Sequence, residues 1–305
     1  MKRIDLHCHV LAFPEYSPRR WGGNKYLSVE EQIEIHDKCG VTFGVLHPIV
    51  IPEAHWATMS NEETQYIVNR YPDRFTWFCN VDPRQGNYTS KSDLGYIISQ
   101  YKELGAKGLG ELGTPLYADD PMMSNLFRFC EELNMPVLVH VGPRIGGTYG
   151  IVDDPGLPRI EKMLKKYPDM QMIGHSAAFW CEIAADSASV DRDGRPEGRI
   201  TKEGRLSHLM REYGNLCCDI SAGSGKNALM RDPEYAVKFI DEFADRIYYG
   251  ADTCKVPGNA HAFPYDFLQF LDNLASDGSI SPQNYEKIMY KNAAKLLGME
   301  DRFNG

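Results

Sequence analysis

"KRIDLHCHV" (residues 2–10) places two histidines one residue apart at the end of a short run with alternating apolar residues. Side chains alternate between the two faces of a β-strand, so we expect His7 and His9 on one face together with Asp5. Cys8 and the apolar residues are expected on the other face. Two imidazoles about 6 to 7 Å apart along a strand can converge on one metal ion, although a lone pair also occurs as ordinary surface or core histidines.

The rest of the chain alternates short apolar runs with longer amphipathic ones. Strands are expected near residues 2–6, 42–46, 75–81, 106–111, 136–141, 170–174, 215–220 and 247–251. Ser28, followed by Glu30 and Glu31, and Pro233 after Asp232 are typical of helix starts. Eight strand–helix alternations in about 275 residues match a (β/α)8 barrel in count and size, with a doubly wound sheet as the alternative. We therefore expect an α/β fold, a TIM barrel.

Composition limits the possible partners and the number of domains. The chain has 305 residues, 43% of them hydrophobic, and a net charge of −9. No linker rich in Gly, Pro or Ser divides it, so residues 1–305 are expected to form one domain. The acidic balance argues against a nucleic-acid partner, since phosphate binding needs clustered Lys and Arg. No apolar run approaches the length of a membrane span, and we expect no signal peptide because the first charged strand begins almost at once.

The cysteines point to a reducing compartment. There are eight of them, scattered and without a CxxC pair, and the neighbours of Cys79 and Cys217 are apolar. This pattern is typical of buried free thiols rather than a disulfide framework. We expect a cytoplasmic protein.

Polar, metal-competent residues follow several of the expected strands, at the ends where a barrel enzyme places its active site. They are His7 and His9 after the first strand, Glu111 after the fourth, His140 after the fifth, His175 after the sixth and Asp252 after the eighth. One such residue can be a satisfied core histidine, but five strands that all end in this way predict a common site. His47, after the second strand, is a weaker candidate for the same pocket.

Two further features concern loops and cofactors. The connections at 10–27 and 176–200 are longer than ordinary turns, and in a barrel they lie over the active-site mouth. The stretch "GLGELG" (108–113) has the spacing of a dinucleotide fingerprint. The sequence after it lacks the helix start and the distant acidic residue that such a site needs, so no nucleotide cofactor is expected.

Five motifs, in this order, resemble the amidohydrolase superfamily and in particular its amidohydrolase-2 branch. They are "DLHCH" (5–9), "LVHVG" (138–142), "IGHSA" (173–177), "YYGADT" (248–253) and "YKNAAKLLGM" (290–299). The branch contains metal-dependent hydrolases and decarboxylases of aromatic or dienoic acids, such as aminocarboxymuconate-semialdehyde decarboxylase and γ-resorcylate decarboxylase. The resemblance implies a small-molecule substrate, and it is compatible with a homodimer.

The resemblance also implies a set of ligands for one divalent cation: His7, His9, His140 and Asp252. Zinc is the first choice, with manganese or iron as alternatives, because three imidazoles and one carboxylate suit such a metal. His175 would lie beside the water or the substrate oxygen. Glu111 departs from the single-metal pattern: it could bridge two ions, contact one, or orient the substrate.

The implied reaction is hydrolysis, in which metal-activated water attacks a small amide, ester or lactone. Asp252 would act as general base, and His175 would stabilise the developing oxyanion. The alternative is a metal-dependent, non-oxidative decarboxylase of an aromatic or dienoic acid. A barrel that keeps its metal only as a structural element is the third hypothesis.

Substrate contacts are expected from residues near the mouth. Arg144 is the best-placed arginine for holding an acid, followed by Arg19 and Arg20. Trp180 and Trp21 could stack on an aromatic substrate.

Overall fold

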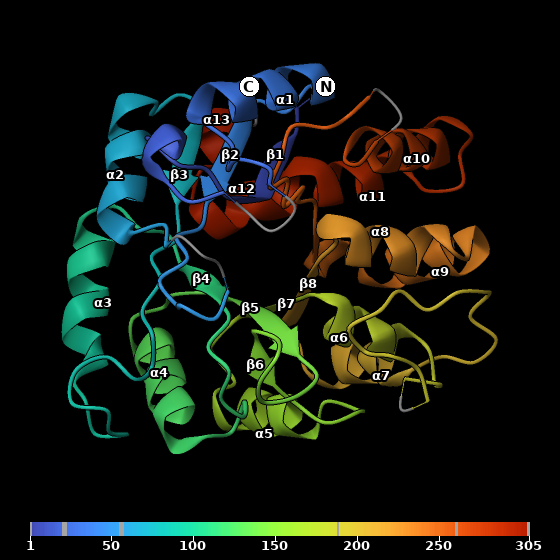
Figure 1. Cartoon of the computed structure of the whole chain (residues 1–305). Coiled ribbons are helices and arrows are strands. Elements are labelled where there is room, and N and C mark those ends of the chain that lie inside the picture. The colour runs from blue at the N-terminus through green and yellow to red at the C-terminus, as the bar shows by residue number, and fades with distance from the viewer. Residues whose placement is uncertain (1, 20–22, 55–57, 188, 260–261, 304–305) are drawn as a thin grey trace.

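A ring of parallel strands surrounded by helices forms the centre of the molecule (Figure 1). The computed structural model describes residues 2–19, 23–54, 58–187, 189–259 and 262–303. The strands of the ring are β1 (Ile4–Cys8), β2 (Phe43–Leu46), β3 (Phe75–Trp77), β4 (Leu109–Leu112), β5 (Val137–Gly142), β7 (Met172–His175), β8 (Leu216–Asp219) and β9 (Ile247–Tyr248).

Backbone hydrogen bonds close these strands into a barrel. The strands pair in the orders β1-β2-β3 and β4-β5-β7-β8-β9, all in parallel, while the short strand β6 (Ile151–Val152) pairs with β5 outside the ring. Cys79 N donates to Gly108 O at 2.9 Å, which joins β3 to β4. Leu6 N donates to Tyr249 O at 2.9 Å, which joins the last strand to the first. The predicted TIM barrel is confirmed, and the doubly wound sheet is excluded.

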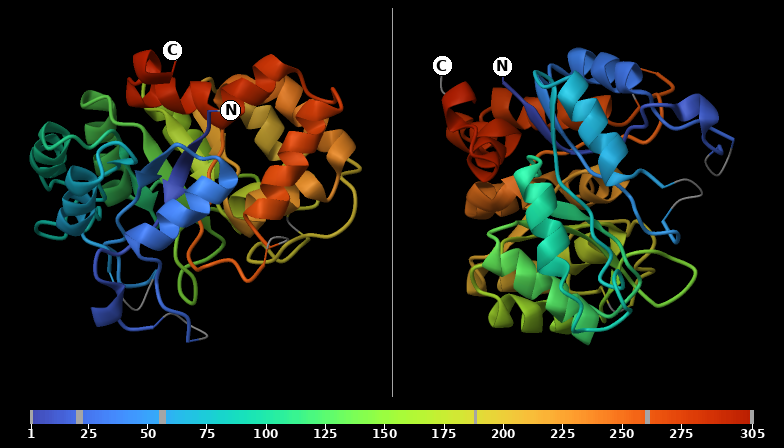
Figure 2. Two further views of the ribbon diagram at one scale, coloured as in Figure 1. Left: turned by 90° about the horizontal axis from the view of Figure 1, so that it is seen from above. Right: turned by 90° about the vertical axis from the view of Figure 1, so that its left-hand side faces the viewer.

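Helices cover the outside of the barrel, as the two views in Figure 2 show. They are α1 (Val29–Cys39), α2 (Asn61–Arg70), α3 (Leu94–Glu103), α4 (Pro121–Glu132), α5 (Pro158–Lys166), α6 (Ala177–Trp180), α7 (Arg205–Glu212), α8 (Ala222–Met230), α9 (Pro233–Phe243), α10 (Tyr265–Ser276), α11 (Pro282–Glu286), α12 (Asn292–Leu297) and α13 (Glu300–Phe303). Ser28 and Glu31 form the capping box that starts α1, and Gly40 ends it in the left-handed conformation. Asp232 caps α9 ahead of Pro233, as the sequence predicted.

Because side chains alternate between the two faces of each strand, they form two apolar layers, one inside the barrel and one between the strands and the helices. In β5, Val137 and Val139 belong to the layer between the strands and the helices. Leu138 belongs to the smaller cluster that fills the barrel. His140 is two residues beyond Leu138, so it shares the inward face of the strand. Because β7 and β8 follow the same rule, polar residues form the last inward layer at the carboxyl end of the barrel.

Strand β1 breaks this alternation. Ile4 and Leu6 pack inside the barrel, so a regular strand would turn His7 towards the helices. The pairing of β1 with β2 shifts register between Asp5 and Cys8, and His7 is thereby turned inwards.

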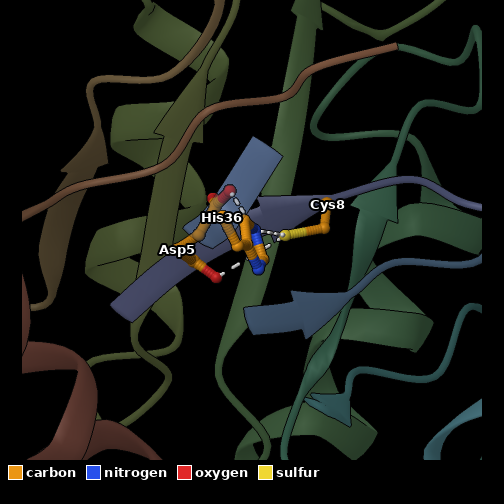
Figure 3. Close-up of side chains that lie close together, drawn as sticks. All are labelled: Asp5, Cys8 and His36. Atoms are coloured by element: carbon orange, nitrogen blue, oxygen red, sulfur yellow. Dashed lines mark hydrogen bonds and ion pairs between the residues drawn. The ribbon is translucent and has the colours of Figure 1, made fainter. Parts of the chain in front are cut away.

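The side chains of Asp5 and Cys8 instead meet His36 of α1, and Figure 3 shows the three pointing towards one another. His36 Nε2 lies 3.1 Å from Asp5 Oδ2 and 3.6 Å from Cys8 Sγ. The prediction that Asp5 shares a face with His7 and His9 is wrong, because the bulge separates them.

Three further features bear on the predictions. Seven of the eight cysteines are buried, and Cys254 is partly exposed, all with free thiols. Lys2 Nζ donates to Phe303 O at 2.8 Å, so the two ends of the described chain lie together. Among the described residues, no helix is long and apolar enough to cross a membrane.

Candidate metal centre

Four donor side chains meet at the carboxyl end of the barrel. The Nε2 atoms of His7 and His9 lie 2.9 Å apart. Glu111 Oε2 lies 3.6 Å from the first of these nitrogens and 3.3 Å from the second. Asp252 Oδ1 lies 4.0 and 3.6 Å from the same two atoms. The four donors therefore surround one small space.

Two more histidines lie on the other side of the carboxylates. His140 Nδ1 is 2.6 Å from Glu111 Oε1. His175 Nε2 is 3.9 Å from that same oxygen and 3.6 Å from Asp252 Oδ2. The structure thus brings together all six metal and catalytic residues that the sequence predicted. Oε2 of Glu111 therefore faces the His7–His9 pair, and its Oε1 faces His140 and His175.

Asp219, at the end of β8, is a member of the cluster that the sequence reasoning missed. Its Oδ2 lies 2.7 Å from His7 Nδ1 and 3.3 Å from His175 Nδ1. Ser221 Oγ donates to the same oxygen at 2.6 Å. The signal was present in the sequence, because "LCCDI" also ends an apolar strand with a carboxylate.

The hydrogen bonds of His7 and His9 test whether a cation fits between them. His9 Nδ1 lies 2.8 Å from the carbonyl oxygen of His47, which can only accept, so this nitrogen carries the proton. His7 Nδ1 faces the carboxylate of Asp219 in the same way. If both rings are neutral, each turns an unprotonated Nε2 towards the other, and two lone pairs at 2.9 Å repel unless a proton or a metal cation lies between them. The donor set fits a divalent metal, and this second layer of acceptors is typical of metal-ligating histidines.

His47 acts through its backbone and lies behind the centre. Its Nε2 donates to Leu6 O at 2.7 Å, and its ring packs against Phe78. Burial lowers the pKa of His47 to about 3, and the neighbouring histidines add to the effect. His47 is therefore a neutral support for β1 and His9.

Electrostatics in the cluster favour a bound positive charge. Burial alone would lower the pKa of His7, but the charges of Asp252, Asp219 and Glu111 raise it well above the usual range. Burial would likewise raise the pKa of Asp252, and the nearby histidines lower it to about 2. Three buried or nearly buried carboxylates in one cluster attract protons or, more strongly, a divalent cation.

The centre opens into two adjoining cavities. One, of about 510 Å³, is lined by His140, His175 and Asp252. The other, of about 650 Å³, shares Asp252, Tyr149 and Arg195 with the first. Their walls include Asn24 and Tyr26 from the first long connection, and Asp193 and Arg195 from the second. Both connections therefore border the mouth, as predicted.

Two predicted substrate contacts lie elsewhere. Arg144 is 55% exposed, and its Nη1 lies 2.5 Å from Asp193 Oδ2, so its charge is already paired. Trp180 is buried in the apolar layer around the barrel, and its Nε1 donates to Asp219 O at 3.0 Å. Its ring packs against Phe179 and Phe239 and lines neither of the two cavities. Arg19 is exposed and donates to Gly23 O; Arg20 and Trp21 lie outside the described residues.

Comparison with solved structures agrees with this architecture. An uncharacterised TIM-barrel protein from Bordetella bronchiseptica is 18% identical with a TM-score of 0.66, and the match covers 99% of this chain and 100% of that one. A probable 2-pyrone-4,6-dicarboxylic acid hydrolase from Acinetobacter baumannii, with citric acid bound, is 16% identical with a TM-score of 0.60, over 98% and 100% of the two chains. A dihydroxybenzoic acid decarboxylase from Polaromonas sp. JS666, with bound manganese and 2-nitroresorcinol, is 16% identical with a TM-score of 0.54, over 98% and 97%. At these identities the likeness concerns the fold.

Comparison with family models identifies the family directly. No curated protein sequence matches the chain. The amidohydrolase model of the amidohydrolase-2 branch matches residues 4–299, which includes every residue of the centre. The chain belongs to the amidohydrolase family.

Proposed function

We propose that this protein is a metal-dependent hydrolase that cleaves a small amide, ester or lactone. The observation that carries the proposal is the approach of His7 Nε2 to His9 Nε2 at 2.9 Å, with both Nδ1 atoms held by acceptors. This arrangement supports a divalent cation held by His7, His9, Asp252 and Glu111, with His140 beside Glu111. Zinc is the metal we propose first, and manganese or iron would suit the same donors.

When bound, the cation would supply Lewis acidity at the substrate oxygen and lower the pKa of a water molecule. Asp252 Oδ2 is turned away from the His7–His9 pair and towards His175, and the cavity gives a substrate access to it. We assign it the role of accepting the proton of the attacking water and passing it to the leaving group.

His175 is positioned by Asp219. Its Nδ1 faces the carboxylate, so its Nε2 is presented to the space beside Asp252. From there it can hold the water or contact the oxygen on which charge develops. Ser221 Oγ, 3.0 Å from His175 Nδ1, also limits the rotation of the ring.

Decarboxylation is the second candidate. The ring of Tyr149 lies 4.2 Å from that of His140, at 36° between planes, and borders both cavities. A flat aromatic acid that enters the cavities could stack on the ring of Tyr149. A manganese-bound decarboxylase of similar fold acts on such acids, which is why this candidate is retained.

An assay with two readouts separates the candidates. The zinc-loaded protein is given amides, esters and lactones, with titration of released acid, and aromatic carboxylic acids, with measurement of CO2. We expect hydrolysis, no CO2, and loss of activity in Asp252→Asn without a change in thermal unfolding. Release of CO2 would favour the second candidate, and no turnover by metal-loaded protein on either panel would overturn both.

A further inference from the structure

The second long connection carries three arginines, and two of them are already paired. Arg192 Nη1 donates to Asp153 O at 2.7 Å, and Nη2 lies 3.3 Å from Glu182. Arg199 lies 3.3 Å from Asp232 and also contacts a second acid of α9. Arg195 makes no hydrogen bond or ion pair with any residue that the structure describes. Its charge is therefore available to a ligand.

Among the described residues, Arg195 is also the arginine that lines the two cavities at the candidate metal centre. It lines both cavities, and each of these also contains Asp252. Its guanidinium rests against Gly223 near the start of α8, where an added Cβ would lie 2.3 Å from Nη2. A side chain at residue 223 would push the guanidinium away, so the glycine keeps it in the cavity wall.

Lys255 adds a second positive charge on the same wall. It lines the larger cavity with Arg195 and has no partner among the described residues. Asp193, an acid that borders the smaller cavity, forms an ion pair with Arg144, with 2.5 Å between Oδ2 and Nη1. In a chain with a net charge of −9, two cations beside one cavity that have no partner among the described residues indicate an anionic ligand.

We propose that Arg195 binds a carboxylate of the substrate that the reaction leaves intact. The planar guanidinium can donate two parallel hydrogen bonds to a carboxylate, which fixes the orientation as well as the position of the ligand. The carboxylate would lie at Arg195, with Lys255 near it, while the scissile amide, ester or lactone lies at the metal centre. The substrate class is then a small organic acid. The choice of reaction rests on the function proposed above, but the binding of the acid does not.

Whether binding depends on the metal distinguishes this arrangement from one in which the carboxylate is the reacting group. A carboxylate held by Arg195 should bind with or without the cation, whereas one that reacts at the metal should need it. Calorimetric titrations with isophthalate, neutral isophthalamide and phenyl phosphate are carried out on zinc-loaded protein and on chelator-treated protein that circular dichroism shows to be folded. If the metal-free protein unfolds, the proposal is tested by the titrations of the zinc-loaded wild type and variants alone.

Isophthalate should bind both forms and more tightly than the amide or the phosphate. In Arg195→Gln its affinity should fall about 10- to 100-fold, the effect of losing a hydrogen bond to a charged group. Gly223→Ala should weaken binding as well, although every charge remains. Arg199→Gln, a paired arginine of the same connection, is the matched control and should bind as the wild type does.

Isophthalate that binds only with metal, or equally well to Arg195→Gln, would overturn the proposal. Tighter binding of phenyl phosphate would overturn the assignment of a carboxylate. If the protein hydrolyses none of the tested substrates but still binds isophthalate through Arg195, the proposed reaction is overturned and the proposed carboxylate site is not.

Discussion

Asp219 Oδ2 lies 2.7 Å from Nδ1 of His7, on the side of the ring opposite the candidate metal centre. The contact fixes both the orientation and the tautomer of the ring, so that Nε2 is left as a lone pair for a cation. Burial opposes the charge of Asp219, but hydrogen bonds from His175 and His7 keep its pKa well below the usual range. One buried carboxylate thus orients two of the histidines.

Replacing Asp219 with Asn should weaken metal binding without unfolding the barrel. The amide loses the charge that holds the His7 and His175 rings, and such changes behind a metal ligand cost about 10- to 100-fold in affinity. Competition with a chromogenic chelator measures the change. Asp272→Asn, which alters a carboxylate paired with Arg3 outside the cluster of donors, is the control. Equal affinities in the two variants would contradict the role of Asp219.

Glu111→Gln tests the carboxylate that faces both pairs of histidines. Its Oε2 lies 3.3 Å from His9 Nε2, while its Oε1 lies 2.6 Å from His140 Nδ1. The neutral amide is a poorer ligand and cannot balance the charge of a cation, so we expect divalent metal to bind at least about 10-fold more weakly. Equilibrium dialysis gives affinity and stoichiometry together. Unchanged values would show that Glu111 does not contact metal.

His36→Leu tests the support behind β1. Asp5 has 0% exposure, and its Oδ2 faces His36, while Oδ1 accepts from the backbone nitrogens of His7 and Ala251. Removing one partner of such a buried pair costs about 3–5 kcal/mol in the free energy of unfolding, measured by urea denaturation. His208→Leu removes an exposed histidine on α7 and should change stability by less than about 1 kcal/mol. A comparable loss in the two variants would refute the structural role of His36.

Asp153 should make stability depend on pH in a particular direction. Burial raises its pKa to about 6, against the opposing effect of hydrogen bonds from the nitrogens of Ile160, Arg159 and Asp154. Between the unfolded value near 4 and the folded value near 6, the folded protein holds the extra proton, so stability falls as pH rises across this window. The loss is at most about 3 kcal/mol.

The measurement is urea unfolding of the wild type and of Asp153→Asn from pH 4 to pH 7. The variant lacks the titrating group, so its stability should decline less across the window. Parallel curves would contradict the raised pKa.

The sequence predicts the barrel well because its signals are local. Each apolar strand such as 137–142 is followed by an amphipathic helix, and the inward position after Leu138 is a histidine. The same local rule finds His175 and Asp252, and applied to Cys217 it would also have found Asp219.

The parts that the sequence did not predict depend on distant contacts. Asp5 was expected beside His7 because alternation along one strand says so, but the register shift of β1 against β2 decides otherwise. The pairing of Arg144 with Asp193, and the isolation of Arg195, depend on how an irregular connection folds over the mouth. No spacing rule within one stretch contains that information.

The most direct test of the metal centre is the metal content of the purified protein, measured by inductively coupled plasma mass spectrometry after growth with zinc, manganese and iron. We expect at least one divalent ion per chain in the wild type, and its loss from a folded double variant with His7→Ala and His9→Ala. A wild-type protein without bound metal, or a double variant that retains the ion, would contradict the account.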